Sequence, residues 1–259
     1  MRIKILVAAH KAFPMPDDHD LYLPVLVGAV RNANPAISYQ RDDEGLNISA
    51  KNPNYNELTA LYWAWKNLRN VDAIGLVHYR RYFLKAHGKR ELTNILTNKD
   101  VENNLAQADV IVPKKRRYYI ETNYSHYVHA HHQEPLDLTR KVIVSQYPSY
   151  LEAFDNVMNQ RSAHMFNMMI MKQPYFDQYC EWLFAVLGQV EERLDLTSYS
   201  VQEKRVFGYF SELLRDVWLT KNQIKYQEVR WGQLGSQHLI KKMSFFVLRK
   251  LGIKEKTHF

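Results

Sequence analysis

One stretch constrains the fold more than any other, because it joins a buried strand to a group of polar side chains. Residues 73–77 form an unbroken apolar run, and His78, Tyr79, Arg80 and Arg81 follow it directly. An apolar run without alternation predicts a strand buried on both faces of a parallel sheet that helices cover. In open α/β sheets the ligand crevice lies outside the carboxyl ends of the strands. The stretch therefore predicts either a ligand site at this strand end or a basic surface loop that starts a helix.

The charge of the chain indicates an anionic partner. Two adjacent arginines suit phosphate, since a guanidinium group binds phosphate oxygens through two hydrogen bonds. The net charge of +8 and the pI near 9.3 favour nucleic acid, a phosphorylated substrate or an anionic lipid surface as the partner. A second basic run, residues 114–117, follows another apolar run in the same way. It indicates either a solvated face or more cations at a strand end.

The order of the patterns predicts one large α/β domain, residues 1–236, with a mostly parallel central sheet flanked by helices. Pro24 makes residues 22–27 an edge strand or a loop, and residues 31–56 are expected to form a long functional loop. Strands are expected at 2–10, 73–77, 108–113, 162–171 and 226–229, and helices at 57–68, 97–106, 138–160, 174–194 and 205–219.

Several classes of protein and of site lack their sequence signals. No glycine-rich loop follows the first strand, which argues against a dehydrogenase or an NTPase. Cys180 is the single cysteine, so an internal disulfide framework and a cysteine-cluster zinc site are excluded. A phosphatase or nuclease would need clustered carboxylates. Four histidines, His126, His129, His131 and His132, could hold a metal, but residues 121–137 better fit a mobile aromatic and histidine-rich loop over the substrate.

The last segment, residues 237–259, alternates apolar with basic side chains. This pattern predicts a tail that binds a membrane surface, or else a helix packed on the domain with a solvated basic face. No signal peptide precedes the first strand, and no apolar run approaches the roughly 20 residues of a spanning helix. We expect a cytoplasmic protein, peripheral to the inner face of the cell membrane.

Three polar residues have positions that suggest a role. Asn167 interrupts an apolar run, and a buried asparagine must either satisfy backbone groups or face a polar ligand. Glu212 is flanked by apolar residues of a predicted helix, which favours a raised pKa and a general base, although Arg205 or Arg215 could instead pair with it. Glu57 lies in the first turn of a helix, where the helix dipole favours a carboxylate; a ligand role competes evenly.

Five ordered blocks, residues 4–10, 51–60, 75–83, 161–168 and 205–214, together resemble an uncharacterised-domain family of bacterial capsular and exopolysaccharide glycosyltransferases. The resemblance covers about residues 3–230. It implies a GT-A-like fold, a UDP-sugar donor, and a lipid-linked polysaccharide repeat unit as acceptor. Galactose or galactofuranose is the leading sugar that the resemblance implies.

The resemblance also implies roles for individual residues. Ala8, Ala9 and His10 would border the nucleotide pocket, and Asp42 or Asp43 would contact the uridine or the ribose. A base, Glu212 or Asp137, would deprotonate the acceptor hydroxyl if the reaction inverts the anomeric centre, which is the outcome we expect. The other expected donor-binding residues are Asn52, Glu57, His78, Arg80 and Arg81, the last three at the diphosphate, and Asn167 at the donor sugar or the acceptor.

One departure from the family pattern concerns the metal. GT-A enzymes usually carry Asp-x-Asp at the end of a central strand, where it holds a divalent cation, but here residues 78–81 occupy that position. Asp18 and Asp20 lie in the first loop, which is the wrong context. We expect cationic side chains to neutralise the leaving diphosphate, with no metal site and no required cofactor, because both guanidinium groups and Mg²⁺ stabilise charge on phosphate oxygens.

The main alternative is a protein that binds nucleic acid or another anionic polymer without catalysis. Basic charge interleaved with tyrosines would suit that function. The basic groups lie at strand ends and in the tail rather than along one helix, and no nucleic-acid motif is present. The sequence therefore favours the transferase and predicts no nucleic-acid partner.

Overall fold

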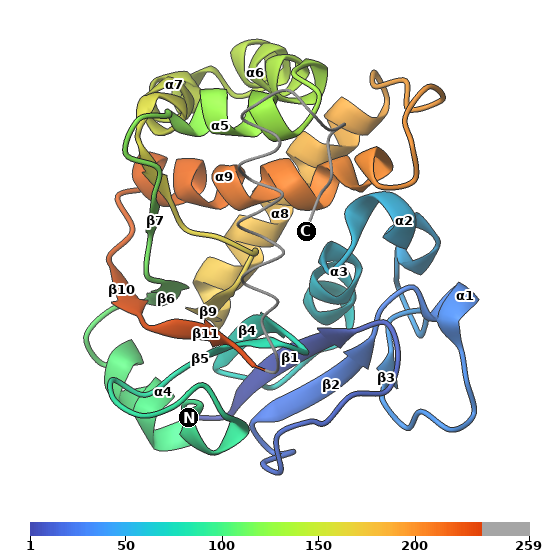
Figure 1. The fold of residues 1–259 in the computed structure, drawn as a ribbon, viewed down its shortest axis with the longest axis vertical. Helices are drawn as coiled ribbons and strands as arrows, with labels where there is room; N and C mark the ends of the chain where they lie inside the picture. Colours follow the sequence, from blue (N-terminus) through green and yellow to red (C-terminus); the bar gives the residue numbers. More distant parts are fainter. Residues whose placement is uncertain (235–259) are drawn as a thin grey trace, which may run out of the picture.

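The computed structural model describes residues 1–234 of the chain (Figure 1). The predicted tail, the domain boundary after residue 236 and the membrane contact through the tail lie outside the described residues. Within residues 1–234, no helix is long and apolar enough to cross a membrane.

A nine-stranded sheet is the centre of the described part of the chain, and its main path runs β10-β6-β9-β4-β1-β2-β3. The pairs β4-β1, β1-β2, β2-β3 and β10-β6 are parallel, whereas β9 is antiparallel to both of its neighbours. The predicted fold class, a mostly parallel sheet flanked by helices, is confirmed. The strands of this path are β1 Ile3–Ala9, β2 Tyr22–Leu26, β3 Gln40–Arg41, β4 Ala73–His78, β6 Val110–Pro113, β9 Met169–Lys172 and β10 Tyr226–Val229.

Short antiparallel strands bring distant segments to the end of β4. Strand β5, Arg81–Phe83, pairs with β4 through His78 and Arg81, so the chain reverses immediately after the central strand. Strand β11, Trp231–Gln233, pairs with β5 on its other side. A separate pair joins β7, Arg116–Arg117, to β8, Ser162–Ala163.

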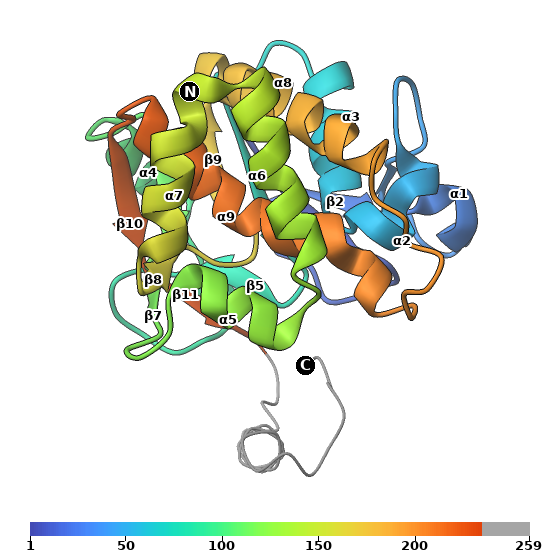
Figure 2. The same cartoon turned by 90° about the horizontal axis from the view of Figure 1, so that it is seen from above.

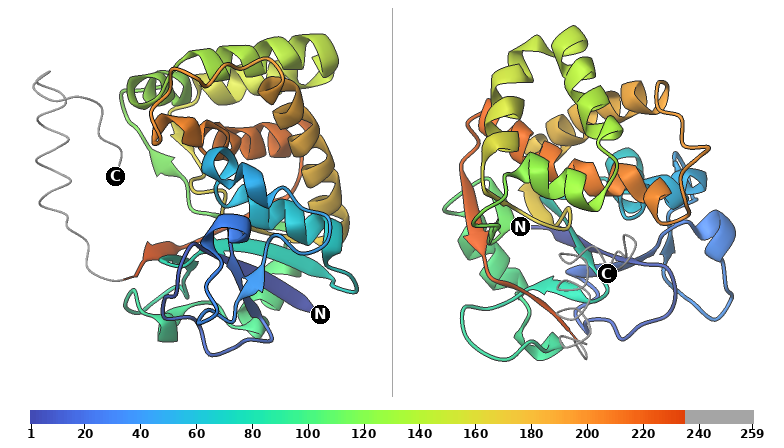
Figure 3. Two further views of the ribbon diagram at one scale, coloured as in Figure 1. Left: turned by 90° about the vertical axis from the view of Figure 1, so that its right-hand side faces the viewer. Right: turned by 45° about the horizontal axis from the view of Figure 1, so that its top comes forward.

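Helices cover both faces of the sheet, and most of them lie on one face (Figures 1 and 3). Helices α3, α8 and α9 pack near the strands, and α5, α6 and α7 form a further layer beyond α9. Helix α4 covers the other face, where it contacts β6. The helices are α1 Ala29–Asn32, α2 Asn52–Tyr55, α3 Leu58–Asn67, α4 Asn98–Leu105, α5 Asn123–Ala130, α6 Glu134–Gln146, α7 Leu151–Asn159, α8 Gln173–Glu191 and α9 Val206–Lys221.

The two-sided cover explains the unbroken apolar runs. In β1, Leu6 and Ala8 belong to the large core under α3, α8 and α9, whereas Ile5 and Val7 belong to the second core, which contains residues of α4. Successive side chains of a strand point to opposite faces. A strand with apolar cores on both faces must therefore be apolar at every position, as the predictions at 2–10 and 73–77 assumed.

The single strand predicted over 162–171 is wrong. The structure divides this segment into β8 and β9, separated by Phe166 and Asn167, which have φ values of 71° and 52°. Two successive residues in the left-handed region cannot continue a strand. The apolar pattern did not reveal this turn, because neither residue is a glycine.

Two predicted loops are also wrong. Residues 121–137 contain α5 and the start of α6, and α5 begins at a capping box in which the side chains of Thr122 and Ser125 bind each other's backbone amides. Residues 31–56 contain β3, α2 and a 3₁₀ turn, Ser49–Lys51.

Strand β2 is not at the edge of the sheet, as Pro24 had suggested, because β3 lies beyond it. Strand β3 pairs only with Val25 and Leu26 of β2. The Val27 amide donates to the Ala9 carbonyl of β1, so the alternation along β2 turns the Pro24 nitrogen away from β1. The Pro24 nitrogen, which carries no hydrogen, is on the side of β2 that faces β3, but β3 begins only opposite Val25. The sheet therefore loses no hydrogen bond at Pro24.

Candidate functional site

Arg81 places a cation beside the end of β4. The hairpin from β4 to β5 carries its guanidinium over the ring of Phe166, with Cζ 4.3 Å from the ring centroid. Its Nε is buried and has no hydrogen-bond partner within the described residues. Burial lowers the pKa of Arg81, and the negative charges of Glu212 and Glu57 oppose that shift. A buried donor without a partner is costly to the fold and is satisfied when a ligand oxygen binds it.

Glu212 lies on helix α9, is partly buried and interacts electrostatically with Arg81. Loss of hydration raises the pKa of Glu212 to about 7, and the charge of Glu57 adds to this shift. A backbone hydrogen bond from Phe166 and the charges of Arg215 and Arg81 oppose it. The predicted upward shift is thus present, and it gives a carboxyl group that can accept a proton near neutral pH.

Asn167 ties three segments together through its amide. Its Nδ2 donates to Glu57 Oε1 at 2.7 Å and to the Gly208 carbonyl at 2.9 Å, and its Oδ1 accepts from Ser211 Oγ at 3.1 Å. The residue is 1% exposed. Both functions of the amide are therefore used inside the protein, and the side chain orients the Glu57 carboxylate.

His78 holds the other side of the same turn. Its Nε2 lies 2.6 Å from the Phe166 carbonyl oxygen and 4.0 Å from Glu57 Oε1. A carbonyl oxygen can only accept, so Nε2 carries the proton and donates. Burial lowers the pKa of His78, so the ring is neutral near pH 7. In this structure His78 positions the turn, and its ring carries no charge for the diphosphate contact expected of it.

Backbone strain is concentrated at this place. Asn56, which precedes Glu57, has φ 52°, and Phe166 and Asn167 also have positive φ. Each such residue costs of order 1–3 kcal/mol and persists only when its surroundings impose it. Here the surroundings are the Glu57, His78 and Gly208 contacts of the same turn. Clusters of this kind are typical of functional sites.

Arg205 is a further cation of the site that the sequence analysis did not assign to ligand binding. Its Nε donates to Asn56 Oδ1 at 2.8 Å, and its charge contributes to lowering the pKa values of His10, His78 and Arg81. Its position at the start of the block 205–214, one of the five blocks that carry the family resemblance, was the signal that could have identified it from the sequence. The turn before α9 brings it beside Arg81, although 124 residues separate them in the chain.

An aromatic cluster borders the ends of β1 and β4. Phe13 and Tyr79 stack with centroids 3.8 Å apart, and His10 meets both rings edge-on. The Cζ of Arg80 lies 5.2 Å from the Tyr79 ring and 5.4 Å from the Phe13 ring. Burial lowers the pKa of His10, with a contribution from Lys11. The predicted residues His10 and Arg80 thus share one basic and aromatic surface.

The absence of a side chain at Gly208 leaves room for the side chain of Asn56, so we expect Gly208→Ala to destabilise the protein. A Cβ at position 208 would lie 2.3 Å from Asn56 Nδ2. The expected loss in the free energy of unfolding is about 1–3 kcal/mol, measured by urea denaturation. Gly188→Ala in α8 is the matched control, because nothing lies within 4 Å of its Cβ. That variant should gain about 0.5–1 kcal/mol, and equal shifts in the two variants would contradict the prediction.

Asp42 does not lie where a nucleoside could reach it. The residue is 0% exposed, and its carboxylate accepts from the amides of Gly28 and Ala29 at 2.8 and 2.9 Å. It also accepts from the hydroxyls of Ser49 and Thr59 at 2.5 and 2.6 Å. The side chain therefore holds the β2–α1 turn to α3, and the structure assigns it to the fold.

We expect Asp42→Asn to reduce the free energy of unfolding by about 2–3 kcal/mol, because an amide nitrogen would face donors that can no longer be satisfied. Asp43→Asn is the control. Asp43 pairs with Arg41 at 2.6 Å near the surface, and such pairs contribute about 1 kcal/mol or less. Thermal and urea unfolding of the two variants would test the difference. A loss of about 1 kcal/mol or less in both variants would show that the four hydrogen bonds of Asp42 contribute little to stability.

The remaining predicted donor-binding residues have structural surroundings. Ala8 and Ala9 are buried at the end of β1, and the Ala8 carbonyl accepts from the Tyr79 amide at 3.2 Å. Asn52 donates to the Asn56 carbonyl at 2.8 Å and so supports the strained turn. These three residues shape the site through the backbone.

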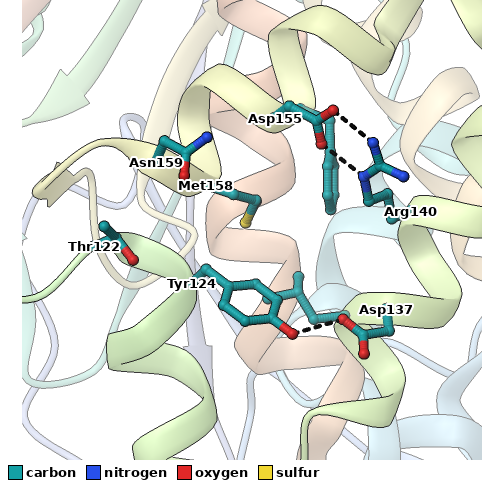
Figure 4. A pocket seen from close by; sticks show the side chains of 9 residues that line it. Thr122, Tyr124, Asp137, Arg140, Asp155, Met158 and Asn159 are labelled. Carbon is teal, nitrogen blue, oxygen red and sulfur yellow. Dashed lines mark hydrogen bonds and ion pairs between the residues drawn. The ribbon is translucent and has the colours of Figure 1, made fainter.

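Asp137, the alternative base, lies elsewhere. Its Oδ1 accepts from Tyr124 at 2.8 Å, and its Oδ2 accepts from Gln133 at 2.7 Å. It lines a cavity of about 300 Å³ between α5, α6 and α7, next to the Arg140–Asp155 ion pair (Figure 4). Figure 1 places these helices on the far side of α9 from the strands. Glu212 and Asp137 therefore do not share a site.

The four histidines of residues 126–132 do not converge. His126 and His129 both bind Glu121 through Nδ1, at 2.7 and 3.0 Å, whereas His132 binds Glu203 at 2.8 Å and His131 stacks on Tyr209. In the part of the chain that the structure describes, no group of three or more His, Cys, Asp or Glu residues is arranged to hold a metal ion. The predicted independence from metal remains a prediction.

Comparison with known proteins gives two matches. A family model described as Domain of unknown function (DUF4422) matches residues 4–223. The fold also matches the apo structure of WbbM, a bifunctional glycosyltransferase, with a TM-score of 0.82 and 28% sequence identity. The match covers 91% of this chain and 46% of WbbM, so the chain spans less than half of that protein. No curated protein matches the sequence.

Proposed function

The chain belongs to the family described as Domain of unknown function (DUF4422), and from its likeness to WbbM we propose that it is a glycosyltransferase. In our proposal it moves a sugar from a UDP-sugar to a hydroxyl of a lipid-linked polysaccharide repeat unit. Galactose or galactofuranose is the leading sugar. The likeness to WbbM supports glycosyl transfer as the reaction class. The residues at the end of β4 support the proposed mechanism.

The observation that carries the proposal is that Glu212 and Arg81 both contact Phe166, Glu212 through the backbone amide and Arg81 through the ring. Glycosyl transfer needs a base for the acceptor hydroxyl and positive charge for the leaving diphosphate. A carboxyl with a pKa of about 7 meets the first need, and a half-buried guanidinium whose Nε is buried and unpaired meets the second. The two groups interact electrostatically, so they belong to one site.

The proposed reaction inverts the anomeric centre in one displacement. Glu212 accepts the proton of the acceptor hydroxyl while that oxygen forms a bond to the anomeric carbon. The bond between this carbon and the β-phosphate oxygen breaks, and its electron pair remains on UDP. Arg81 and Arg205 stabilise the charge that develops there. Glu212 then releases its proton to solvent.

The surrounding residues orient this chemistry. The His10, Phe13 and Tyr79 cluster would border the nucleotide, with Arg80 at its edge. Asn167 acts through Glu57, because both functions of its amide are already bonded. Glu57 in turn adds to the negative field that keeps the pKa of Glu212 high.

Calorimetric titration with UDP, in EDTA and again in Mn²⁺, tests donor binding, and release of UDP from UDP-galactose tests turnover. We expect equal affinity in both buffers, because arginines supply the charge. Strict dependence on Mn²⁺ would retain the transferase and refute the metal-free site. Absence of UDP binding, together with steeply salt-dependent binding to DNA or RNA, would favour the non-catalytic polymer-binding alternative.

A further inference from the structure

Two adjacent apolar side chains between β7 and α5 are almost fully exposed. Tyr119 is 77% exposed and Ile120 is 75% exposed. Among residues 1–234, the other large apolar side chains that are exposed stand singly in the sequence. Single exposed apolar residues are ordinary, but an adjacent pair at the tip of a projecting segment points to a partner.

Positive charge surrounds this pair. Lys114, Arg116, Arg117 and Arg161 are exposed, and the β7–β8 pairing sets Arg117 beside Ser162. The Tyr118 amide donates to the Arg161 carbonyl at 2.9 Å, and the Arg161 guanidinium donates to the Tyr119 carbonyl at 3.2 Å. Arg161 is therefore held at the tip by two hydrogen bonds.

The acidic residue that follows the pair, Glu121, is bound to two histidines of α5. Its two oxygens bind the Nδ1 atoms of His126 and His129 at 2.7 and 3.0 Å. These contacts lower the pKa of Glu121, and the carboxylate is directed to α5. We call Lys114, Arg116, Arg117, Tyr119, Ile120 and Arg161 the docking tip.

The docking tip lies next to the proposed base. The side chain of Tyr118 points inward, where its hydroxyl contacts Met165 Sδ at 3.1 Å. Burial raises the pKa of Tyr118 to about 12, and the charge of Glu212 adds to that shift. Strand β7, helix α5 and strand β11, which pairs with Arg81, lie along the same edge of the molecule (Figure 2). Tyr118, which lies between the tip residues Arg117 and Tyr119 in the chain, is therefore within electrostatic reach of Glu212.

We propose that the docking tip binds an anionic membrane surface. Tyr119 and Ile120 enter the interfacial region of the lipid, where tyrosine is favoured, and the arginines contact anionic headgroups. The benefit of this contact to the protein rests on the proposed function, because membrane binding would bring a lipid-linked acceptor to Glu212. The contact itself needs neither donor nor acceptor, and it is distinct from the tail, which lies outside the described residues.

A fluorescent probe at the tip tests this contact directly. Cys180 is fully buried, so Ile120→Cys offers a single accessible thiol for an environment-sensitive dye. We expect its emission to shift to the blue with vesicles that contain phosphatidylglycerol, and to stay unchanged with phosphatidylcholine alone. Leu46→Cys is the matched control, because Leu46 is 66% exposed but follows the acidic residues 42–44. A dye at position 120 that stays in water while the protein binds vesicles would overturn the proposal.

Co-sedimentation of the full chain with the same vesicles tests the charges. Each removed cation is expected to reduce partitioning about fivefold, so Arg116→Ala with Arg117→Ala should reduce it about 25-fold. Lys99→Ala, an exposed change on α4, should have little effect. Unchanged partitioning of the double variant would refute the docking tip. Because no UDP is present, this failure is distinguishable from a failure of donor binding, which calorimetry reports separately.

Discussion

Glu212→Gln is expected to lower the rate of sugar transfer by about 10²–10⁴-fold, which is the usual contribution of a general base. The amide preserves the shape of the side chain but cannot accept the proton of the acceptor hydroxyl. UDP affinity should change little, because the arginines bind the diphosphate. Steady-state kinetics and UDP calorimetry on the same preparation would measure both. Asp137→Asn is the control, since that carboxylate lies beyond α9 and should leave the rate within about twofold.

The same residue predicts the dependence of the rate on pH. The base must be ionised, and the pKa of Glu212 is about 7. kcat/KM should therefore rise between about pH 6 and 8 and then level off. Glu212→Gln should remove this limb, leaving a low and flat profile. A variant that keeps the wild-type limb would show that another group accepts the proton.

Stability should respond to pH in the opposite sense. The folded protein holds the Glu212 proton up to about pH 7, whereas the unfolded chain releases it near the ordinary value for glutamate. The contribution of this group to stability is full below that ordinary value, and it is lost as the pH rises through 7. Glu212→Gln should therefore unfold at a higher temperature than the wild type at pH 8, with a smaller difference at pH 5. Calorimetric Tm values at both pH values would measure the effect.

Arg81→Met is expected to weaken UDP binding about a hundredfold, which corresponds to about 2.7 kcal/mol. A guanidinium that forms two charge-assisted hydrogen bonds to phosphate accounts for a loss of this size. The folded protein should be as stable as the wild type or more stable. Methionine removes a half-buried charge and an unpaired Nε but retains contact with the Phe166 ring. Calorimetry with UDP and thermal unfolding would measure these two effects.

Arg80→Met is the matched comparison for Arg81. Arg80 is exposed and lies at the edge of the Phe13 and Tyr79 rings, so its charge is more strongly screened by water. We expect its loss to weaken UDP binding only a few-fold, and more at low salt than at high salt. Wild-type affinity in Arg81→Met would place the diphosphate away from the end of β4.

The sequence located the strands and helices whose apolar pattern follows from their own burial. The apolar runs at 2–10 and 73–77 are strands because both faces of the sheet are covered, and helical spacing located α3, α8 and α9. The capping box at Thr122 was missed because the histidines after it suggested a loop. Tertiary contacts decided that Pro24 lies in an inner strand and that Asp42 is a buried acceptor.

The candidate site could be predicted only in part. The apolar neighbours of Glu212 and the change from apolar to basic residues at Arg81 are local patterns, so both groups could be named from the sequence. The strain at Phe166 and Asn167 could not be, since no local pattern marks a left-handed pair without glycine. Arg205 was also missed, because its charge matters only once the turn before α9 meets the end of β4.

The sequence by itself determined the fold class and the position of the central strand, and it offered two candidate acids and a group of cations at the end of that strand. These follow from periodicity and burial, which depend on near neighbours in the chain. Only the tertiary structure separated Glu212 from Asp137 in space, made His78 a neutral donor and placed Tyr119 and Ile120 at the surface. Those outcomes depend on desolvation and, for His78, on a partner 88 residues away, which no local pattern encodes.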